Sequence, residues 1–164
     1  MALRYVDPYR KRGRVYKANA RFGRSRAGQF LARHLAPRVD PWLHRISGGR
    51  ANMGLIINAP LTTTGAKSGQ PRVTQLTYFH DGSDPIVMAS NYGGQKHPQW
   101  YYNLRAHPEC DFGGESFVGS EVTDPDEYAR LWALAQRVYP GYGDYQAKTA
   151  PVGRQIPIFR LRPR

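Results

Sequence analysis

The sequence predicts a mostly β protein with helices, in which a small, largely antiparallel barrel is preceded by a basic helical arm. Three observations predict this fold class. About six short segments rich in Val, Ile, Thr and Tyr are separated by turn residues, as is typical of strands. Two segments have the pattern of helices, and the positive charge is concentrated in the first fifty residues. We expect the strands to close into a barrel because closure leaves no exposed strand edge.

The chain of 164 residues is long enough for one domain, or for one domain with an arm. Residues 1–50 contain 13 Lys and Arg residues and only two acidic residues, whereas residues 51–164 contain 11 Lys and Arg residues and 10 acidic ones. We therefore expect a basic helical arm over residues 1–50 and a nearly neutral barrel domain over residues 51–164.

Within the arm, apolar residues recur at helical spacing between Ala27 and Leu35, and most arginines lie elsewhere around the helix. This pattern predicts a basic amphipathic helix that ends before Pro37. Asp40-Pro41 has the residues of a helix N-cap and first turn, and Ser47-Gly48-Gly49 has those of a helix stop. A second, short helix is therefore expected over Trp42–Ile46.

The sequence has neither the run of about 18 apolar residues that spans a bilayer nor an apolar block of signal-peptide length. Its single cysteine, Cys110, excludes an internal disulfide and is expected to be unreactive. We therefore expect a cytoplasmic protein. The amphipathic helix either packs on the barrel or rests on anionic lipid, which would make the protein peripheral at the inner face of the cell membrane.

The barrel domain is expected to consist of short strands and two inserted helices. The strands are expected at Leu55–Thr64, Arg72–His80 and Pro85–Ser90, on either side of Gly113-Gly114, and at Ile156–Leu161. Pro98 begins a helix that continues to about Ala106, and Asp124-Pro125 caps a second helix whose apolar face extends from Tyr128 to Val138.

Several familiar chemistries are excluded by their motifs. The segment Gly65–Gly69 resembles a phosphate-binding loop, but a Walker A motif requires a glycine where Ala66 stands. No G-x-S-x-G nucleophile motif is present. The five histidines show no pair at metal-ligand spacing beside a carboxylate, so we expect no metal site.

Two polar segments remain as candidate binding sites. The turn between Thr62 and Arg72 places two cations, hydroxyls and backbone N–H groups around glycines, which suits an anionic group, although an ordinary solvated turn has the same composition. The segment from Ala89 to Pro98 adds a flexible loop, Lys96 and a helix N-terminus.

Four motifs, in order and with preserved spacing, resemble the deazaflavin-dependent nitroreductase family of actinobacteria. They lie at Leu61–Arg72, Met88–Asn91, Lys96–Pro108 and Val138–Gln146. The resemblance implies a split β-barrel of the flavin or deazaflavin-binding type that binds the deazaflavin coenzyme F420. It further implies an oxidoreductase that transfers a hydride from the reduced coenzyme to a quinone, a nitro compound or another conjugated acceptor.

The resemblance also implies a set of cofactor-binding residues. The phosphate end of the coenzyme would meet Ala66, Lys67 and Ser68. One strand would follow its tail and ring with Arg72, Val73, Thr74, Gln75, Leu76 and Thr77. The floor beside the ring would be formed by Met88, Ala89, Ser90 and Asn91, and a helix end would wrap around it with Gln99, Trp100, Tyr101, Tyr102 and Asn103.

On the acceptor side, the resemblance implies that Tyr142 closes the slot over the reactive face and that Tyr139 and Tyr145 line the substrate pocket. Ser90 and Tyr142 are the catalytic candidates, since the proton that reaches the reduced acceptor could come from Ser90, a tyrosine or water.

This sequence departs from the family pattern at three of these positions. The family usually has Arg or Lys at the position of Ala66, often has proline at that of Gln75, and often has an aromatic or apolar residue at that of Thr77. One contact to the coenzyme tail is therefore expected to be missing, and the acceptor pocket is expected to differ in shape.

Two other interpretations stay open. FMN, with its shorter phosphate tail, would also suit Lys67, Ser68 and Arg72 in the same barrel. A nucleic-acid-binding protein could act through the basic arm alone, since polyanions attract such a segment without catalysis, but only the charge of the arm favours it.

Overall fold

The computed structural model describes residues 3–11 and 57–164, together with the single positions 13, 14, 16, 18, 21, 22, 25, 27, 28, 30, 35 and 39. The chain divides into one unit made of Met1–Arg10 and Ala59–Arg164 and a second unit, Lys11–Asn58. Residues 3–10 thus group with the barrel, whereas the sequence led us to expect them in the arm. The helix expected at Trp42–Ile46 lies outside the described residues, and the helix expected at Ala27–Leu35 is described at four positions only.

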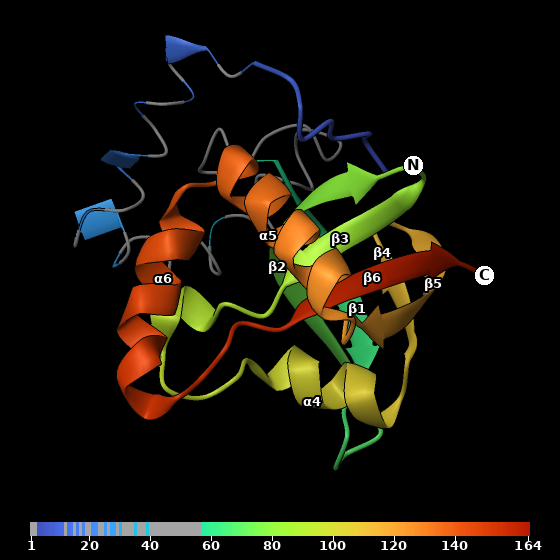
Figure 1. The fold of residues 1–164 in the computed structure, drawn as a ribbon. Helices are drawn as coiled ribbons and strands as arrows, with labels where there is room; N and C mark the ends of the chain where they lie inside the picture. Colours follow the sequence, from blue (N-terminus) through green and yellow to red (C-terminus); the bar gives the residue numbers. More distant parts are fainter. Residues whose placement is uncertain are drawn as a thin grey trace. The chain divides into compact units, whose positions relative to one another are not determined.

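Six strands close into a barrel in the order β1, β2, β3, β6, β5, β4 (Figure 1). They are β1 (Asn58–Thr64), β2 (Pro71–Asp81), β3 (Asp84–Met88), β4 (Glu109–Phe112), β5 (Glu115–Glu121) and β6 (Ile158–Pro163). Antiparallel pairing joins β1 to β4, β2 to β3, β3 to β6, β4 to β5 and β5 to β6. The predicted barrel is confirmed, with boundaries within three residues of those expected.

Alternation along the strands places large apolar side chains inside the barrel. Phe79, Phe112 and Phe159, from three different strands, are at most 1% exposed. The β2–β3 hairpin turns at Gly82, whose φ of 64° is a left-handed conformation that glycine adopts without strain. The barrel interior is therefore a packed core, and any cofactor must bind at its outside or rim.

Three α-helices accompany the barrel: α4 (Gln99–Ala106), α5 (Pro125–Val138) and α6 (Gly141–Thr149). Helix α5 begins as the sequence predicts, because the Asp124 side chain accepts a hydrogen bond of 2.8 Å from the Glu127 N–H. The expectation of two helices was wrong, since α6 is a third. Gly141 and Gly143 weaken its intrinsic helix propensity, and its burial of Tyr142 and Tyr145 compensates. No described helix is both long and apolar enough to span a membrane.

The N-terminal segment is attached to β2 through His80. The Val6 N–H donates to His80 Nδ1 at 3.0 Å, and the His80 N–H donates to the Val6 carbonyl at 2.9 Å. The Tyr78 hydroxyl donates to the Arg4 carbonyl at 2.7 Å, and the Tyr5 ring stacks on His80. These contacts fix residues 4–6 along the barrel wall.

An ion cluster joins the β2–β3 turn to β6 and α5. The buried Arg160 guanidinium pairs with Asp81 at 2.6 Å, with Asp84 at 3.1 Å and with Glu127 at 2.5 Å. Arg130 forms a bidentate pair with Asp81, which lowers the pKa of that carboxyl to about 2. The cluster is thus a charge-compensated brace on the barrel.

Candidate functional site

The turn between β1 and β2 is a compact cationic loop. Its backbone is closed by hydrogen bonds from the Gly65 N–H to the Gln70 carbonyl at 2.9 Å and from the Gly69 N–H to the Gly65 carbonyl at 2.8 Å. Lys67 and Ser68 are exposed at its tip. The turn thus presents a cation and a hydroxyl to solvent on a backbone that is already fixed.

Asn103 of α4 holds this turn from behind. Its side chain is 1% exposed, accepts a hydrogen bond from the Ala66 N–H at 3.0 Å, and donates one to Thr63 Oγ1 at 3.0 Å. The sequence led us to expect Asn103 against the ring of a cofactor. In the structure its amide joins α4 to the end of β1 and to the start of the turn.

The first half of β2 follows the turn and faces solvent. Arg72, Val73 and Thr74 are exposed, and the next three residues, Gln75, Leu76 and Thr77, are half-buried. Gln75 Oε1 is buried and has no hydrogen-bond partner among the residues that the structure describes. A buried acceptor without a partner costs about 1–3 kcal/mol, so this oxygen is suited to a ligand N–H group.

The segment after β3 turns sharply at the expected floor of the site. Met88 and Ala89 are at most 4% exposed, while Ser90 and Asn91 are half-buried. The backbone is left-handed at Asn91, with φ of 47°, and at Tyr92, with φ of 53°. Residues with side chains rarely adopt this region, and such strain gathers at functional sites.

A buried arginine that the sequence analysis missed holds this segment. The Arg154 guanidinium, in a residue 7% exposed, donates to the carbonyl oxygens of Ala89, Ser90 and Gly94 and to His97 Nδ1. Arg154 lies between the short helix η2 (Ala150–Val152) and β6, with no motif around it. No signal in a single sequence points to it.

Helix α4 divides its aromatic residues between the core and the surface. Trp100 and Tyr101 are at most 5% exposed and pack edge-on against Phe159. Gln99 and Tyr102 are exposed, Tyr102 to 44%, while the His97 ring stacks on Tyr101. Of the five residues of α4 that were expected to wrap around the ring, Gln99 and Tyr102 are the two with exposed side chains.

The three tyrosines of the expected acceptor side come together. Tyr139, Tyr142 and Tyr145 are 7%, 5% and 4% exposed, and the hydroxyls of Tyr139 and Tyr145 lie 3.1 Å apart. Burial, together with the neighbouring Tyr139, raises the pKa of Tyr145 above its ordinary value. The Tyr145 hydroxyl therefore keeps its proton at neutral pH.

The floor segment and the tyrosine cluster are neighbours. Tyr92 lies edge-on to Tyr145, with ring centroids 6.2 Å apart. A side chain added at Gly93 would approach the Tyr145 Cα to 3.1 Å, so η1 (Asn91–Gly93) packs tightly on α6. The floor thus packs directly on the tyrosine cluster through η1 and α6, while Asn103 links the cationic turn to α4.

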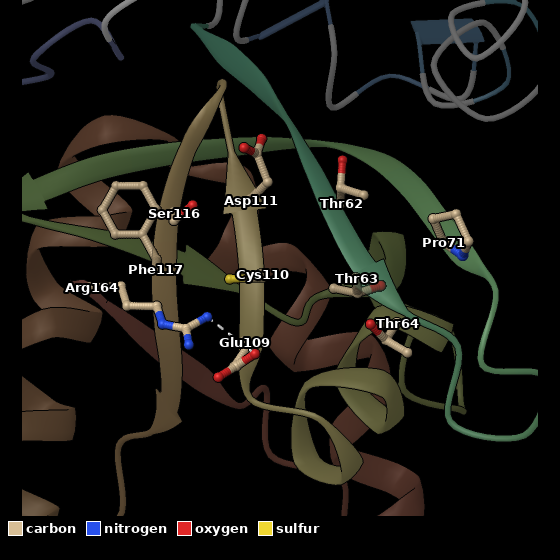
Figure 2. Close-up of a pocket in the computed structure, with 10 residues that line it drawn as sticks. All are labelled: Thr62, Thr63, Thr64, Pro71, Glu109, Cys110, Asp111, Ser116, Phe117 and Arg164. Atoms are coloured by element: carbon tan, nitrogen blue, oxygen red, sulfur yellow. Dashed lines mark ion pairs between the residues drawn. The ribbon is translucent and has the colours of Figure 1, made fainter.

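A shallow groove of about 260 Å³ lies elsewhere, over β1, β4 and β5 (Figure 2). Threonines of β1 line one side of it, and on the other side Arg164 forms an ion pair of 3.2 Å with Glu109. Burial raises the pKa of Cys110, in this groove, to about 12, which makes its thiol inert at neutral pH. Thr62–Thr64 and Pro71, at the two ends of the candidate turn, line the groove, but none of the residues predicted to contact the coenzyme or the acceptor does.

Comparison with known proteins decides the family. The family model of the F420H(2)-dependent quinone reductases matches residues 38–163. The chain belongs to this family. The resemblance to deazaflavin-dependent enzymes that the four motifs indicated is thereby confirmed, and with it the split-barrel fold class.

Individual F420H(2)-dependent quinone reductases match over most of their length. The F420H(2)-dependent quinone reductase Rv1261c of Mycobacterium tuberculosis is 37% identical over 146 residues, which cover 81% of this chain and 95% of the relative. A solved structure of an F420-H2 dependent reductase, FDR-A, is 34% identical with a TM-score of 0.55, covering 64% of this chain and 93% of that one. Another solved chain, described as a domain-swapped dimer, is 31% identical with a TM-score of 0.59, covering 77% of this chain and 98% of that one.

Proposed function

We propose that this protein is an oxidoreductase that transfers a hydride from reduced coenzyme F420 to a quinone. The proposal is carried by one observation: a member of the F420H(2)-dependent quinone reductase family has a cationic turn held by Asn103 and a strained floor segment that is held by Arg154 and packs on a tyrosine cluster. Nitro compounds and other conjugated acceptors have similar flat shapes and belong to the same proposal.

The residues fit the coenzyme at both of its ends. F420 has a carboxylate-rich, phosphate-linked tail, for which Lys67, Ser68 and Arg72 offer exposed cations and a hydroxyl. Its flat head carries polar edges, for which the unpartnered Gln75 Oε1 is an available acceptor. Ala66 contributes no charge, and its N–H is already bonded to Asn103, so the turn offers one cation fewer than the family usually has.

When bound, the coenzyme supplies the hydride, and the protein supplies binding, orientation and exclusion of water. The buried Tyr142 is suited to covering a flat ring, because aromatic rings pack favourably on one another when offset-stacked or edge-to-face. Ser90 Oγ makes no hydrogen bond to the described residues, so its proton is available to a ligand. We propose Ser90 and Tyr142 as the residues at the reacting atoms, with Tyr139 and Tyr145 on the acceptor side.

The cofactor assignment is tested by titrating the purified protein with F420 and, separately, with FMN while following cofactor fluorescence. We expect saturable binding of F420 and weaker binding of FMN, which lacks the carboxylate-rich tail. Tight FMN binding with no response to F420 would overturn the assignment in favour of an FMN-dependent barrel.

We propose further that the basic arm attaches the cytoplasmic protein to the inner face of the cell membrane, where lipid-soluble quinones are delivered. The excess of positive charge in residues 1–50 supports this, because each cation near an anionic surface contributes about 1 kcal/mol. Co-sedimentation with anionic vesicles at low salt, lost on adding salt and absent with neutral vesicles, is the expected result.

The best variant for this test is a substitution and not a truncation, because residues 3–10 contact the barrel and their removal would affect its stability. Replacing Arg24, Arg26 and Arg33 by Gln should reduce co-sedimentation. The matched control replaces three barrel cations, Arg137, Arg162 and Arg164, by Gln. Equal losses in both variants would show that net charge alone matters and would refute a specific role of the arm.

A further inference from the structure

The turn at Asn91 has a backbone that needs outside support. Asn91, Tyr92 and Gly93 follow one another with φ values of 47°, 53° and 74°. A run of left-handed residues that carry side chains is unfavourable in itself and persists only where the surroundings hold it. The turn directly follows the half-buried Ser90 and therefore lies at the centre of the proposed site.

Arg154 provides this support from one side. Its guanidinium donates to the Ala89 and Ser90 carbonyl oxygens before the turn, the latter at 3.3 Å, and to the Gly94 carbonyl oxygen after it, at 2.9 Å. Its Nε donates to His97 Nδ1 at 3.1 Å. One side chain thus fixes both ends of the left-handed turn, which the planar, multiply donating geometry of arginine allows.

The partners of Arg154 in the described structure are neutral. They are three carbonyl oxygens and an imidazole, whereas a buried arginine that serves stability is usually paired with a carboxylate, as Arg160 is. Burial and the charges of Arg154 and Arg105 lower the pKa of His97, which keeps the imidazole neutral and able to accept. This arrangement shapes the loop and leaves a positive charge behind it.

The hydrogen bonds of Arg154 determine where the loop N–H groups point. In a trans peptide the C=O of one residue and the N–H of the next point in opposite directions, and the described chain has no cis peptide. Because the Ser90 carbonyl points toward Arg154 and accepts its hydrogen bond, the Asn91 N–H is directed away from the guanidinium. This N–H has no acceptor among the described residues.

The backbone of Arg154 is in turn held by α6. Gln146 Nε2 donates to the Arg154 carbonyl at 2.9 Å, and Gln146 Oε1 accepts from the Ile156 N–H at 2.9 Å. Since α6 also carries Tyr142 and Tyr145, the residue that shapes the floor is anchored on the helix that carries the tyrosines.

We propose that Arg154 is a positioning residue, which gathers the loop carbonyl groups on one side so that the Asn91 N–H, on the other side, donates a hydrogen bond to the head of the bound deazaflavin. This inference rests on the proposed function. It adds a backbone donor to the cofactor site and assigns to Arg154 the task of aiming it.

The most direct test follows the Asn91 amide by NMR while oxidised F420 is added to the wild-type protein. We expect its hydrogen exchange to slow at least tenfold at saturation, with the amide of Gly82, in the distant β2–β3 turn, as the unchanged control. Saturation by F420 without any change at Asn91 would overturn the inference and leave the proposed function standing. Failure of F420 to bind the wild-type protein would instead refute the proposed function.

A pair of matched variants separates positioning from stability. Arg154→Lys keeps the charge but cannot span carbonyls on both sides of the turn, so F420 affinity should fall tenfold or more. Arg160→Lys makes the same change at an equally buried arginine of the ion cluster and should leave F420 affinity within twofold. Equal affinity losses in the two variants, or wild-type affinity in Arg154→Lys, would overturn the inference.

Two further readouts belong to Arg154→Ala. Removal of the charge should raise the pKa of His97, measured by NMR, toward its ordinary value. Millimolar guanidinium chloride should restore F420 affinity, whereas sodium chloride at the same concentration should not. An unchanged His97 titration with no rescue would contradict the proposal, and should Arg154→Ala not fold, Arg154→Lys and the Asn91 amide still decide it.

Discussion

Replacing Asn103 by leucine should destabilise the barrel and weaken cofactor binding together. Leucine has the same branching and the same number of heavy atoms, so the change removes the amide without opening a cavity. It deletes the two hydrogen bonds of 3.0 Å to the Ala66 N–H and Thr63 Oγ1. Both partners then lie next to an apolar side chain that is almost completely buried.

The expected cost follows from these two bonds. Each contributes about 1 kcal/mol, and a buried group left without a partner costs about 1–3 kcal/mol more. We therefore expect a loss of about 3 kcal/mol in the free energy of unfolding, which for a chain of this length lowers Tm by about 6–12 °C. Because the turn that carries Lys67 loses its anchor, F420 affinity should fall several-fold as well.

Urea unfolding and fluorescence titration with F420 measure the two effects. A double-mutant cycle with Thr63→Val isolates the Asn103–Thr63 bond, and we expect a coupling of about 1 kcal/mol. A stability loss below about 1 kcal/mol would show that Asn103 does not hold the turn, and additive single effects would show that its bond to Thr63 contributes little. If the variant is clearly destabilised but binds F420 with wild-type affinity, the anchoring of the turn by Asn103 does not contribute to cofactor binding.

Three other predictions concern single side chains. Lys67→Ala should weaken F420 binding at least about tenfold, because a charge-assisted contact contributes about 1.5–3 kcal/mol, and an unchanged Kd would show that the turn is an ordinary solvated loop. Tyr142→Phe should keep most of the quinone reductase activity and Tyr142→Ala should lose it if the ring acts by covering; equal damage would mean that the hydroxyl takes part. Burial lowers the pKa of His80, so the unfolded state binds a proton at a higher pH than the folded state does. The free energy of unfolding, measured with urea, should therefore be full above about pH 6.5 and fall below it, and the fall should be smaller in His80→Phe, where His97 still contributes to it.

Most elements of the barrel could be predicted from local chemistry. Alternating β-branched and aromatic residues with Gly turns indicated all six strands, and Asp124-Pro125 indicated the start of α5. Helix α6 could not be predicted in this way, because Gly141 and Gly143 oppose helix formation locally. Its stability comes from burying tyrosines against segments distant in sequence.

The family resemblance indicated which segments to expect in the candidate site, but it did not indicate the contacts that several of their residues make. The resemblance grouped the turn, the floor and the tyrosines; in the structure the floor packs on the tyrosines, and the turn is bonded to α4. The resemblance could not indicate that the Asn103 amide is hydrogen-bonded to the turn and to the end of β1, because that contact depends on α4 packing against a strand end 40 residues away. Nor could it indicate Arg154, whose partners lie more than 55 residues earlier in the chain.

The central claim is hydride transfer from the reduced deazaflavin to a quinone, and anaerobic turnover tests it most directly. Reduced F420 is mixed with the protein and a panel of quinones, furanones and nitro compounds, and its oxidation is followed by absorbance. We expect catalytic oxidation by at least one quinone, with one molecule of quinone reduced per molecule of F420 oxidised and with the rate lowered in Lys67→Ala. No oxidation above the protein-free rate with any quinone, in a protein that binds F420, would contradict the account.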